Sequence, residues 1–240
     1  MGRLHGRAGM MRASPRLIDS QVPQDPRGIV LVLHGGGARR RSMRVSPAQL
    51  SVLRMVPVAA RIARAAPDLV VQRLLNSFRG WDTHHTPVRD VAWAIEEARR
   101  RFGRDLPVSL VGHSLGGRAA LLASRMPPVR SVVALAPWVH PHEGRLEASG
   151  RDVLIVHGDQ DRIASIANAT TVARDLGETA RVGFVTVHGG SHSMLRHHHV
   201  FDAVAAQFVR ATVTGRPPQG PWGDVVTQVL DGERWVALRP

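Results

Sequence analysis

A glycine-flanked serine, Gly112-His113-Ser114-Leu115-Gly116, is the feature that most constrains how this chain can fold. An apolar run over residues 107–111 precedes it and a helix-forming run over 117–123 follows it. The pattern therefore predicts a strand, a sharp turn and a helix. A serine in such a turn takes an unfavourable backbone conformation, and small neighbours let the chain approach itself closely. We expect this turn to expose the Ser114 hydroxyl at the carboxyl end of a strand.

An acid and a histidine follow in equivalent positions. Asp161 ends the motif HGDQD after the apolar run 153–156, and His192 ends the motif HGGSH after the apolar run 182–187. The intervals are 47 residues from Ser114 to Asp161 and 31 residues from Asp161 to His192. Each interval is long enough for a helical return to a parallel strand. The chain order Ser, Asp, His therefore indicates three groups that meet at one edge of a sheet.

These motifs, together with His34-Gly35-Gly36-Gly37 after the apolar run 28–33, resemble the α/β-hydrolase superfamily. Within it the chain is most similar to small, nearly capless serine hydrolases of the dienelactone-hydrolase or peptidase-like kind. The resemblance implies an α/β fold with a doubly wound, mostly parallel sheet, helices on both faces and a minimal cap or none. It also implies a reaction that needs no cofactor.

Apolar runs that alternate with helical periodicity favour the same fold class. Pro57 is expected to kink or divide the first long helix. The segment between Pro137 and Asp152 has room only for a loop and one helical turn, which predicts an open site. Strands are predicted over 28–33, 69–75, 107–111, 131–136, 153–156 and 181–187, and helices over 46–66, 86–102, 117–123, 163–176 and 195–213.

The two ends of the chain differ in character from the hydrolase-like domain, which we assign to residues 28–213. Residues 1–27 are basic and contain three prolines, and we interpret them as a loosely ordered lead-in. Residues 214–240 begin with a linker rich in glycine and proline. Asp231-Gly232 then predicts a turn between two short strands, so we expect a C-terminal β-hairpin.

The resemblance implies a role for each motif residue. Ser114 would be the nucleophile, and His192 would be the general base and later the general acid. Asp161 would hold the imidazole tautomer and stabilise the imidazolium. The backbone N–H groups of Leu115 and Gly36 would bind the oxyanion.

Neighbouring residues leave alternatives open. Asp159 is the alternative to Asp161 as the carboxylate of the triad, and His188 is the alternative to His192 as the base. The H-G-x-x-D spacing of the family favours Asp161, and the position of His192 in the loop after the strand favours His192.

Further candidates surround these motifs. Gly35, His113, Trp138 and Arg39 are candidate substrate contacts. The run Arg39–Arg41 with Arg44 is either a solvated charged segment or a rim that attracts anionic acyl substrates. No metal site is expected at His197–His199, because adjacent helical side chains diverge by about 100° and cannot all face one ion.

Composition narrows the remaining classes of function. The chain has no cysteine, which excludes disulfides and thiolate metal sites. It shows neither a signal peptide nor an apolar run of the roughly 18 residues that span a membrane, so a cytoplasmic protein is expected. The net charge of +13 comes from arginine without any lysine, which is typical of a chain encoded by a genome rich in G and C; a polyanion-binding surface is the alternative explanation. The chain has no tyrosine and few other aromatic residues for base stacking, so nucleic acid is not expected.

The function predicted from the sequence is that of a serine hydrolase acting on a small acyl substrate, a carboxylic ester or a related acyl compound. Peptidase, thioesterase and acyltransferase activities share the same triad and stay open. A non-catalytic polyanion-binding protein on a hydrolase scaffold is the alternative from a different class.

Overall fold

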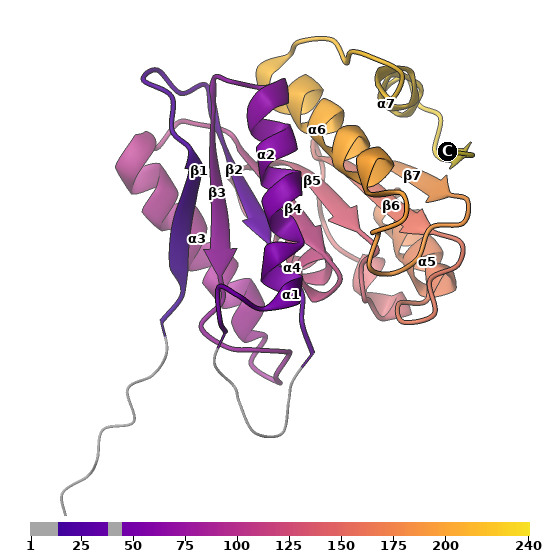
Figure 1. The fold of residues 1–240 in the computed structure, drawn as a ribbon, viewed down its shortest axis with the longest axis horizontal. Coiled ribbons are helices and arrows are strands. Elements are labelled where there is room, and N and C mark those ends of the chain that lie inside the picture. Colours follow the sequence, from indigo (N-terminus) through magenta and orange to yellow (C-terminus); the bar gives the residue numbers. More distant parts are fainter. Residues whose placement is uncertain (1–13, 38–44) are drawn as a thin grey trace, which may run out of the picture.

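The computed structural model describes residues 14–37 and 45–240, and its strands form one eight-stranded sheet (Figure 1). The strand order is β1-β3-β2-β4-β5-β6-β7-β8. Strand β1 is antiparallel to β3, and every other pair is parallel. The strands are β1 (Arg16–Gln21), β2 (Gly28–Leu33), β3 (Leu69–Leu75), β4 (Val108–His113), β5 (Val129–Leu135), β6 (Asp152–Gly158), β7 (Arg181–Val187) and β8 (Trp235–Leu238).

Helices cover both faces of this sheet, so the doubly wound fold class predicted from the sequence is confirmed. Helices α2, α6 and α7 pack on one face, and α3, α4 and α5 pack on the other (Figure 1). Within the described residues, no helix is both long and apolar enough to cross a bilayer. The helices are α1 (Leu50–Leu53), α2 (Met55–Ala65), α3 (Thr86–Phe102), α4 (Leu115–Ala123), α5 (Ile166–Leu176), α6 (His198–Thr214) and α7 (Gly223–Leu230), with a 3₁₀ turn η1 (Pro141–Gly144).

The central strands are apolar throughout because both of their faces are covered. Successive side chains of a strand point to opposite faces. In β2, Ile29 and Leu31 therefore join the core under α3, α4 and α5. Val30 and Val32 join the second core, under α2, α6 and α7. Such double burial explains a continuous apolar run in place of an alternating one.

The first long helical segment is divided, as its proline predicts. Helix α1 ends at Leu53 and α2 begins at Met55. Pro57 has no N–H, and its ring crowds the carbonyl group of the residue four positions earlier, which is Leu53. The break therefore falls where the proline ring interferes with the preceding turn.

Both ends of the chain differ from the sequence-based prediction. Arg16–Gln21, expected in a loosely ordered lead-in, forms the edge strand β1. Residues 225–238, expected as a hairpin, form helix α7 and strand β8, and β8 pairs in parallel with β7. The hairpin prediction was wrong because Val229 packs against Gly183 of β7, where a side chain on residue 183 would clash with it. Burial of this valine outweighs the local turn signal.

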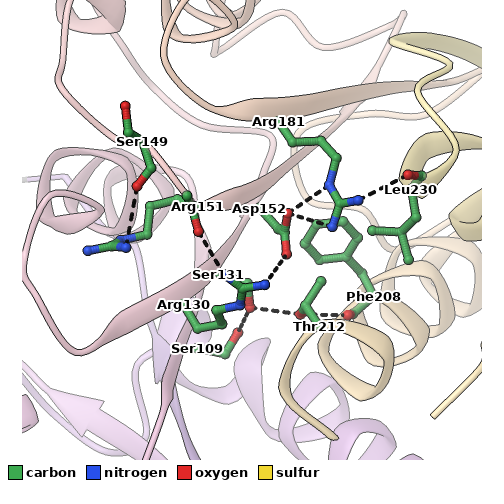
Figure 2. A network of polar contacts seen from close by, with 11 residues as sticks. Ser109, Arg130, Ser131, Ser149, Arg151, Asp152, Arg181, Phe208, Thr212 and Leu230 are labelled. Atoms are coloured by element: carbon green, nitrogen blue, oxygen red, sulfur yellow. Dashed lines mark hydrogen bonds and ion pairs between the residues drawn. The ribbon is translucent and has the colours of Figure 1, made fainter. Parts of the chain in front are cut away.

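A polar network occupies the amino ends of the central strands, opposite the edge described below (Figure 2). Ser131 Oγ donates to Ser109 Oγ over 2.9 Å, and Thr212 Oγ1 of α6 lies 2.9 Å from Ser131 Oγ. Asp152, at the start of β6, accepts a bond of 2.7 Å from Arg181 Nε. These contacts satisfy the buried serine hydroxyl groups and Oδ1 of the buried Asp152 carboxylate, which would otherwise destabilise the sheet.

Candidate active site

The turn after β4 holds Ser114 in a strained conformation. Its φ of 56° and ψ of −119° lie outside the helical and extended regions, and the helix α4 begins at the next residue. A Cβ on Gly112 would lie 2.2 Å from the carbonyl oxygen of Gly116, and one on Gly116 would lie 2.5 Å from that of Leu33. Only glycine fits these two positions, which explains the spacing of the motif.

The side chains of Ser114, His192 and Asp161 form one hydrogen-bonded line. His192 Nε2 lies 3.0 Å from Ser114 Oγ, and His192 Nδ1 lies 2.8 Å from Asp161 Oδ2. The three residues follow β4, β7 and β6, whose carboxyl ends share one edge of the sheet. Because a carboxylate only accepts hydrogen bonds, the ring proton of neutral His192 lies on Nδ1. Nε2 is then free to accept the proton of the Ser114 hydroxyl.

Asp161 is held ionised by four donors. Burial by itself would raise its pKa, but hydrogen bonds from His157 and His192 and from the backbone N–H groups of Ala164 and Ile163 outweigh burial. The pKa of Asp161 is therefore far below its ordinary value. His157 is a contributor that the sequence analysis missed. It belongs to the HGDQD motif, is fully buried, and places Nε2 3.2 Å from Asp161 Oδ2.

Asp159 and His188, the alternatives to Asp161 and His192, pair with each other. His188 Nδ1 lies 2.6 Å from Asp159 Oδ2, and the His188 side chain is 69% exposed. Asp159 also accepts the N–H of Gly189 over 2.8 Å. Of the two histidines, it is His192 whose ring lies within hydrogen-bond distance of Ser114 Oγ. The geometry therefore favours the acid and base that the motif spacing favours.

The loop after β2 approaches the serine closely. A Cβ on Gly35 would lie 2.9 Å from Ser114 Cβ, and Gly36 has a φ of 124°. His34 anchors this loop, since its Nδ1 lies 2.7 Å from the carbonyl oxygen of Gly35 and its Nε2 accepts the N–H of Asn76. Burial lowers the pKa of His34, which keeps the ring neutral in this arrangement.

Solved structures share this architecture, although no family model and no curated protein sequence matches the chain. Est1E from Butyrivibrio proteoclasticus superimposes with a TM-score of 0.61 at 16% identity, over 80% of this chain and 90% of that one. XC6422 from Xanthomonas campestris, an α/β serine hydrolase without a lid, gives 0.60 at 19%, over 85% and 90%. The esterase domain of a Rhodothermus marinus protein gives 0.56 at 16%, over 83% and 99%.

The chain has the α/β-hydrolase fold. The resemblance inferred from the sequence is thereby confirmed at the level of the fold, including the likeness to members without a lid. Strands β5 and β6 of this sheet are joined by residues 136–151, whose only helical element is the single turn η1. The expectation of a minimal cap agrees with this short connection.

The other candidate substrate contacts have distinct surroundings. Trp138 donates its backbone N–H to the carbonyl oxygen of Ser114 over 3.2 Å, and its side chain is 36% exposed. Arg39 and the rest of its arginine run, through Arg44, lie outside the described residues. His197–His199 lie at the cap and first turn of α6. In the part of the chain that the structure describes, no three His, Cys, Asp or Glu side chains are grouped as a metal site requires.

His113, one of the predicted substrate contacts, is buried and contacts His192. Its Nε2 lies 2.8 Å from the carbonyl oxygen of His192, and the two rings are 5.0 Å apart. Burial, and next the neighbouring His192, lower the pKa of His113 to about 3. A neutral His113 therefore donates a hydrogen bond that fixes the loop carrying His192.

We expect His113 to make the fold sensitive to acid. Its pKa of about 3 in the folded chain is below the value of about 6.5 in the unfolded chain, so the unfolded state takes up the proton first as pH falls. This contribution to stability is complete above pH ~6.5 and is lost toward pH ~3, by about 1.4 kcal/mol per pH unit. The free energy of unfolding, measured by urea titration at several pH values between 7 and 4, should fall less steeply with decreasing pH in His113→Gln than in the wild type. If the unfolding free energy of His113→Gln and of the wild type fell equally steeply with pH, the buried neutral imidazole would be contradicted.

We expect Gly35→Ala to lower kcat/KM for an ester by about 10²- to 10³-fold, the effect of losing one oxyanion donor. The added Cβ would displace Ser114 or the loop that carries the Gly36 N–H. Gly37→Ala is a matched control, because no described atom lies within 4 Å of a Cβ at that position. Steady-state kinetics on p-nitrophenyl acetate measure both variants, and equal activity of the two would argue against the Gly35 contact.

Proposed function

We propose that this protein is a serine hydrolase that cleaves a carboxylic ester, or a related acyl bond, through an acyl-enzyme. The observation that carries the proposal is the hydrogen-bonded line from Ser114 through His192 to Asp161. A serine hydroxyl alone is a poor nucleophile, and a neutral imidazole within 3.0 Å supplies the base that it needs. The esterase domain among the structural neighbours supports an ester as the substrate.

In the first half of the reaction, Ser114 Oγ attacks the carbonyl carbon while His192 Nε2 takes the hydroxyl proton. The electron pair of the C=O bond moves to oxygen, and the N–H groups of Leu115 and Gly36 bind the resulting oxyanion. Asp161 stabilises the imidazolium without taking up its proton. When the oxyanion collapses, the bond to the alcohol breaks, and His192 protonates the leaving alkoxide.

In the second half, water replaces the alcohol. His192 Nε2 takes a proton from water as the water oxygen attacks the acyl carbon, and a second oxyanion forms. Its collapse breaks the bond to Ser114 Oγ, which regains a proton from His192. The products are a carboxylic acid and the original enzyme, so the reaction balances without a cofactor.

The rim of the site supports an ester with apolar substituents. Ile163 is 65% exposed just after Asp161, and Leu195 is 65% exposed just after His192. Large apolar side chains that are this exposed, in the loops that carry Asp161 and His192, favour contact with an apolar part of a substrate. We therefore place small-molecule esters ahead of peptides.

Active-site labelling tests the proposal. A fluorophosphonate probe should react with the wild-type chain, and mass spectrometry of the digest should place the adduct on Ser114. Asp159→Asn, in the pair that does not contact Ser114, should label as the wild type does. A folded wild-type chain that is neither labelled nor active on p-nitrophenyl acetate would refute the hydrolase and favour the polyanion-binding alternative, whose signature is steep dependence of binding on salt.

A further inference from the structure

A buried ion pair lies one helical turn beyond the candidate nucleophile. Arg118 of α4 donates through Nε to Glu143 Oε1 and Oε2 of η1 over 2.9 and 3.0 Å, and through Nη2 to Oε1 over 2.6 Å. Their side chains are 7% and 8% exposed. Burial of two charges carries a large desolvation penalty, so an ion pair of this kind is weak evidence for a role in stability. Its position beside Ser114 suggests a role at the site.

Two tryptophans flank the guanidinium group. Arg118 Cζ lies 3.9 Å from the ring centroid of Trp81 and 5.5 Å from that of Trp138, both within cation–π distance. Trp81 follows β3 and Trp138 follows β5, so Arg118 connects loops from two different strands. Helical side chains lean toward the helix N-terminus, which for α4 is the end that carries Ser114.

Glu143 holds the Trp138 loop from the other side. Its Oε2 accepts the backbone N–H of His140 over 2.9 Å. The His140 ring meets Trp138 edge-on at 5.0 Å, and it stacks on His142 at 5.6 Å with an interplanar angle of 9°. The Trp138 N–H also bonds to the Ser114 carbonyl oxygen, so the residue that begins this row of aromatic rings is tied through its backbone to the residue that carries the nucleophile.

Trp138, at the start of this row, is held in place by its neighbours. Trp138 is held by a guanidinium, an imidazole and a backbone hydrogen bond, yet 36% of its side chain is open to solvent. The charge of Arg118 is already neutralised by Glu143. Trp138 therefore offers stacking to a flat ring, while the guanidinium behind it is already paired with a carboxylate.

We propose that Trp138, positioned by the Arg118–Glu143 pair, binds a planar aromatic group of the ester substrate. The proposal rests on the hydrolase function above and adds the substrate class. An aromatic ring gains offset-stacked or edge-to-face contact with tryptophan beyond the area that it buries, whereas an alkyl chain gains only the burial. The aromatic group belongs to the acyl part or to the alcohol part, and the test separates the two.

Two pairs of esters provide the test on the full chain. Methyl cinnamate against methyl octanoate compares acyl parts with methanol as the constant alcohol. Cinnamyl acetate against octyl acetate compares alcohols with acetate as the constant acyl group. The pH-stat gives kcat/KM for each, and the wild type should prefer the aromatic ester roughly 10-fold in one pair. No aromatic preference in either pair would overturn the proposal.

Variants of the surface separate binding from positioning. Trp138→Ala should reduce the aromatic-to-alkyl ratio of kcat/KM roughly 10-fold, mainly through KM, and Trp138→Phe should restore most of it. Trp93→Leu is the matched control, because Trp93 is 39% exposed on α3 and lines a cavity with Arg16 and Glu97 away from Ser114. An unchanged ratio in Trp138→Ala overturns the aromatic subsite.

The double variant Arg118→Met with Glu143→Leu tests the pair itself, since buried ion pairs often tolerate apolar replacement. It should lose the aromatic preference while fluorophosphonate still labels Ser114. Retained preference in the double variant would remove the positioning role of the pair. Failure of Ser114 labelling in the wild type would instead refute the hydrolase function, so the two failures are distinguishable.

Discussion

Replacing Ser114 by alanine is expected to lower kcat for p-nitrophenyl acetate by about 10⁴- to 10⁶-fold. Alanine removes the oxygen that lies 3.0 Å from His192 Nε2, and with it the acyl-enzyme. It keeps a Cβ at the same φ of 56°, so the turn and the fold should be unchanged. Stopped-flow and steady-state hydrolysis measure the loss, with circular dichroism to verify folding.

Ser193→Ala is the matched control for this variant. Ser193 lies in the same loop as His192, is exposed, and contacts Ser191 Oγ at 3.4 Å through its own hydroxyl. Its loss should leave kcat close to the wild-type value. Substantial hydrolysis by a folded Ser114→Ala variant would mean that another group attacks the ester, and the proposed mechanism would then be wrong.

Local signals were sufficient for several elements. Strand β3, helix α3 and strand β7 begin and end at the residues that the sequence predicts. Helix α3 shows why. Pro87 favours the first turn of a helix, and Gly103, with a φ of 141°, ends it. Where backbone chemistry defines both ends of an element, tertiary packing has little to change.

The C-terminal segment shows where local signals are insufficient. Asp231-Gly232 is compatible with a hairpin turn, but Gly232, with a φ of 109°, equally suits the end of helix α7. Val225, Val226 and Val229 lie at helical spacing and enter the core under α6. The outcome depends on a surface created by α6 and β7, which no window of residues around the turn contains.

The candidate site also contains residues that local sequence signals predict and residues that they do not. Ser114, Asp161 and His192 could be brought together from the sequence, because each follows a parallel strand and all such ends share one edge. The contact of Arg118 with Glu143 could not be predicted from the sequence, since it depends on how α4 packs against η1. An arginine in a helix is ordinarily a solvated residue, and nothing near it in the chain distinguishes this one. His157 was overlooked because a histidine within a strand gives no sign of its buried partner.

Asp161→Asn is expected to lower kcat by about 10⁴-fold, with little change in the fold. The Oδ1 atom of Asp161 accepts the N–H groups of Ile163 and Ala164, so the oxygen of an asparagine amide would take that place. Its NH₂ group would then face His192 Nδ1. Two donors cannot share a hydrogen bond, so the ring proton would move to Nε2 and His192 could no longer accept the Ser114 proton.

Asp159→Asn distinguishes the two acids of the HGDQD motif. Asp159 bonds to His188 and to the N–H of Gly189, so its replacement should disturb only that loop and leave kcat close to that of the wild type. The pair of variants is decisive because both remove one carboxylate and keep nearly the same volume. A large loss in Asp159→Asn with none in Asp161→Asn would transfer the orienting role to Asp159. The line of hydrogen bonds through Asp161 Oδ2 would then be an arrangement without catalytic consequence.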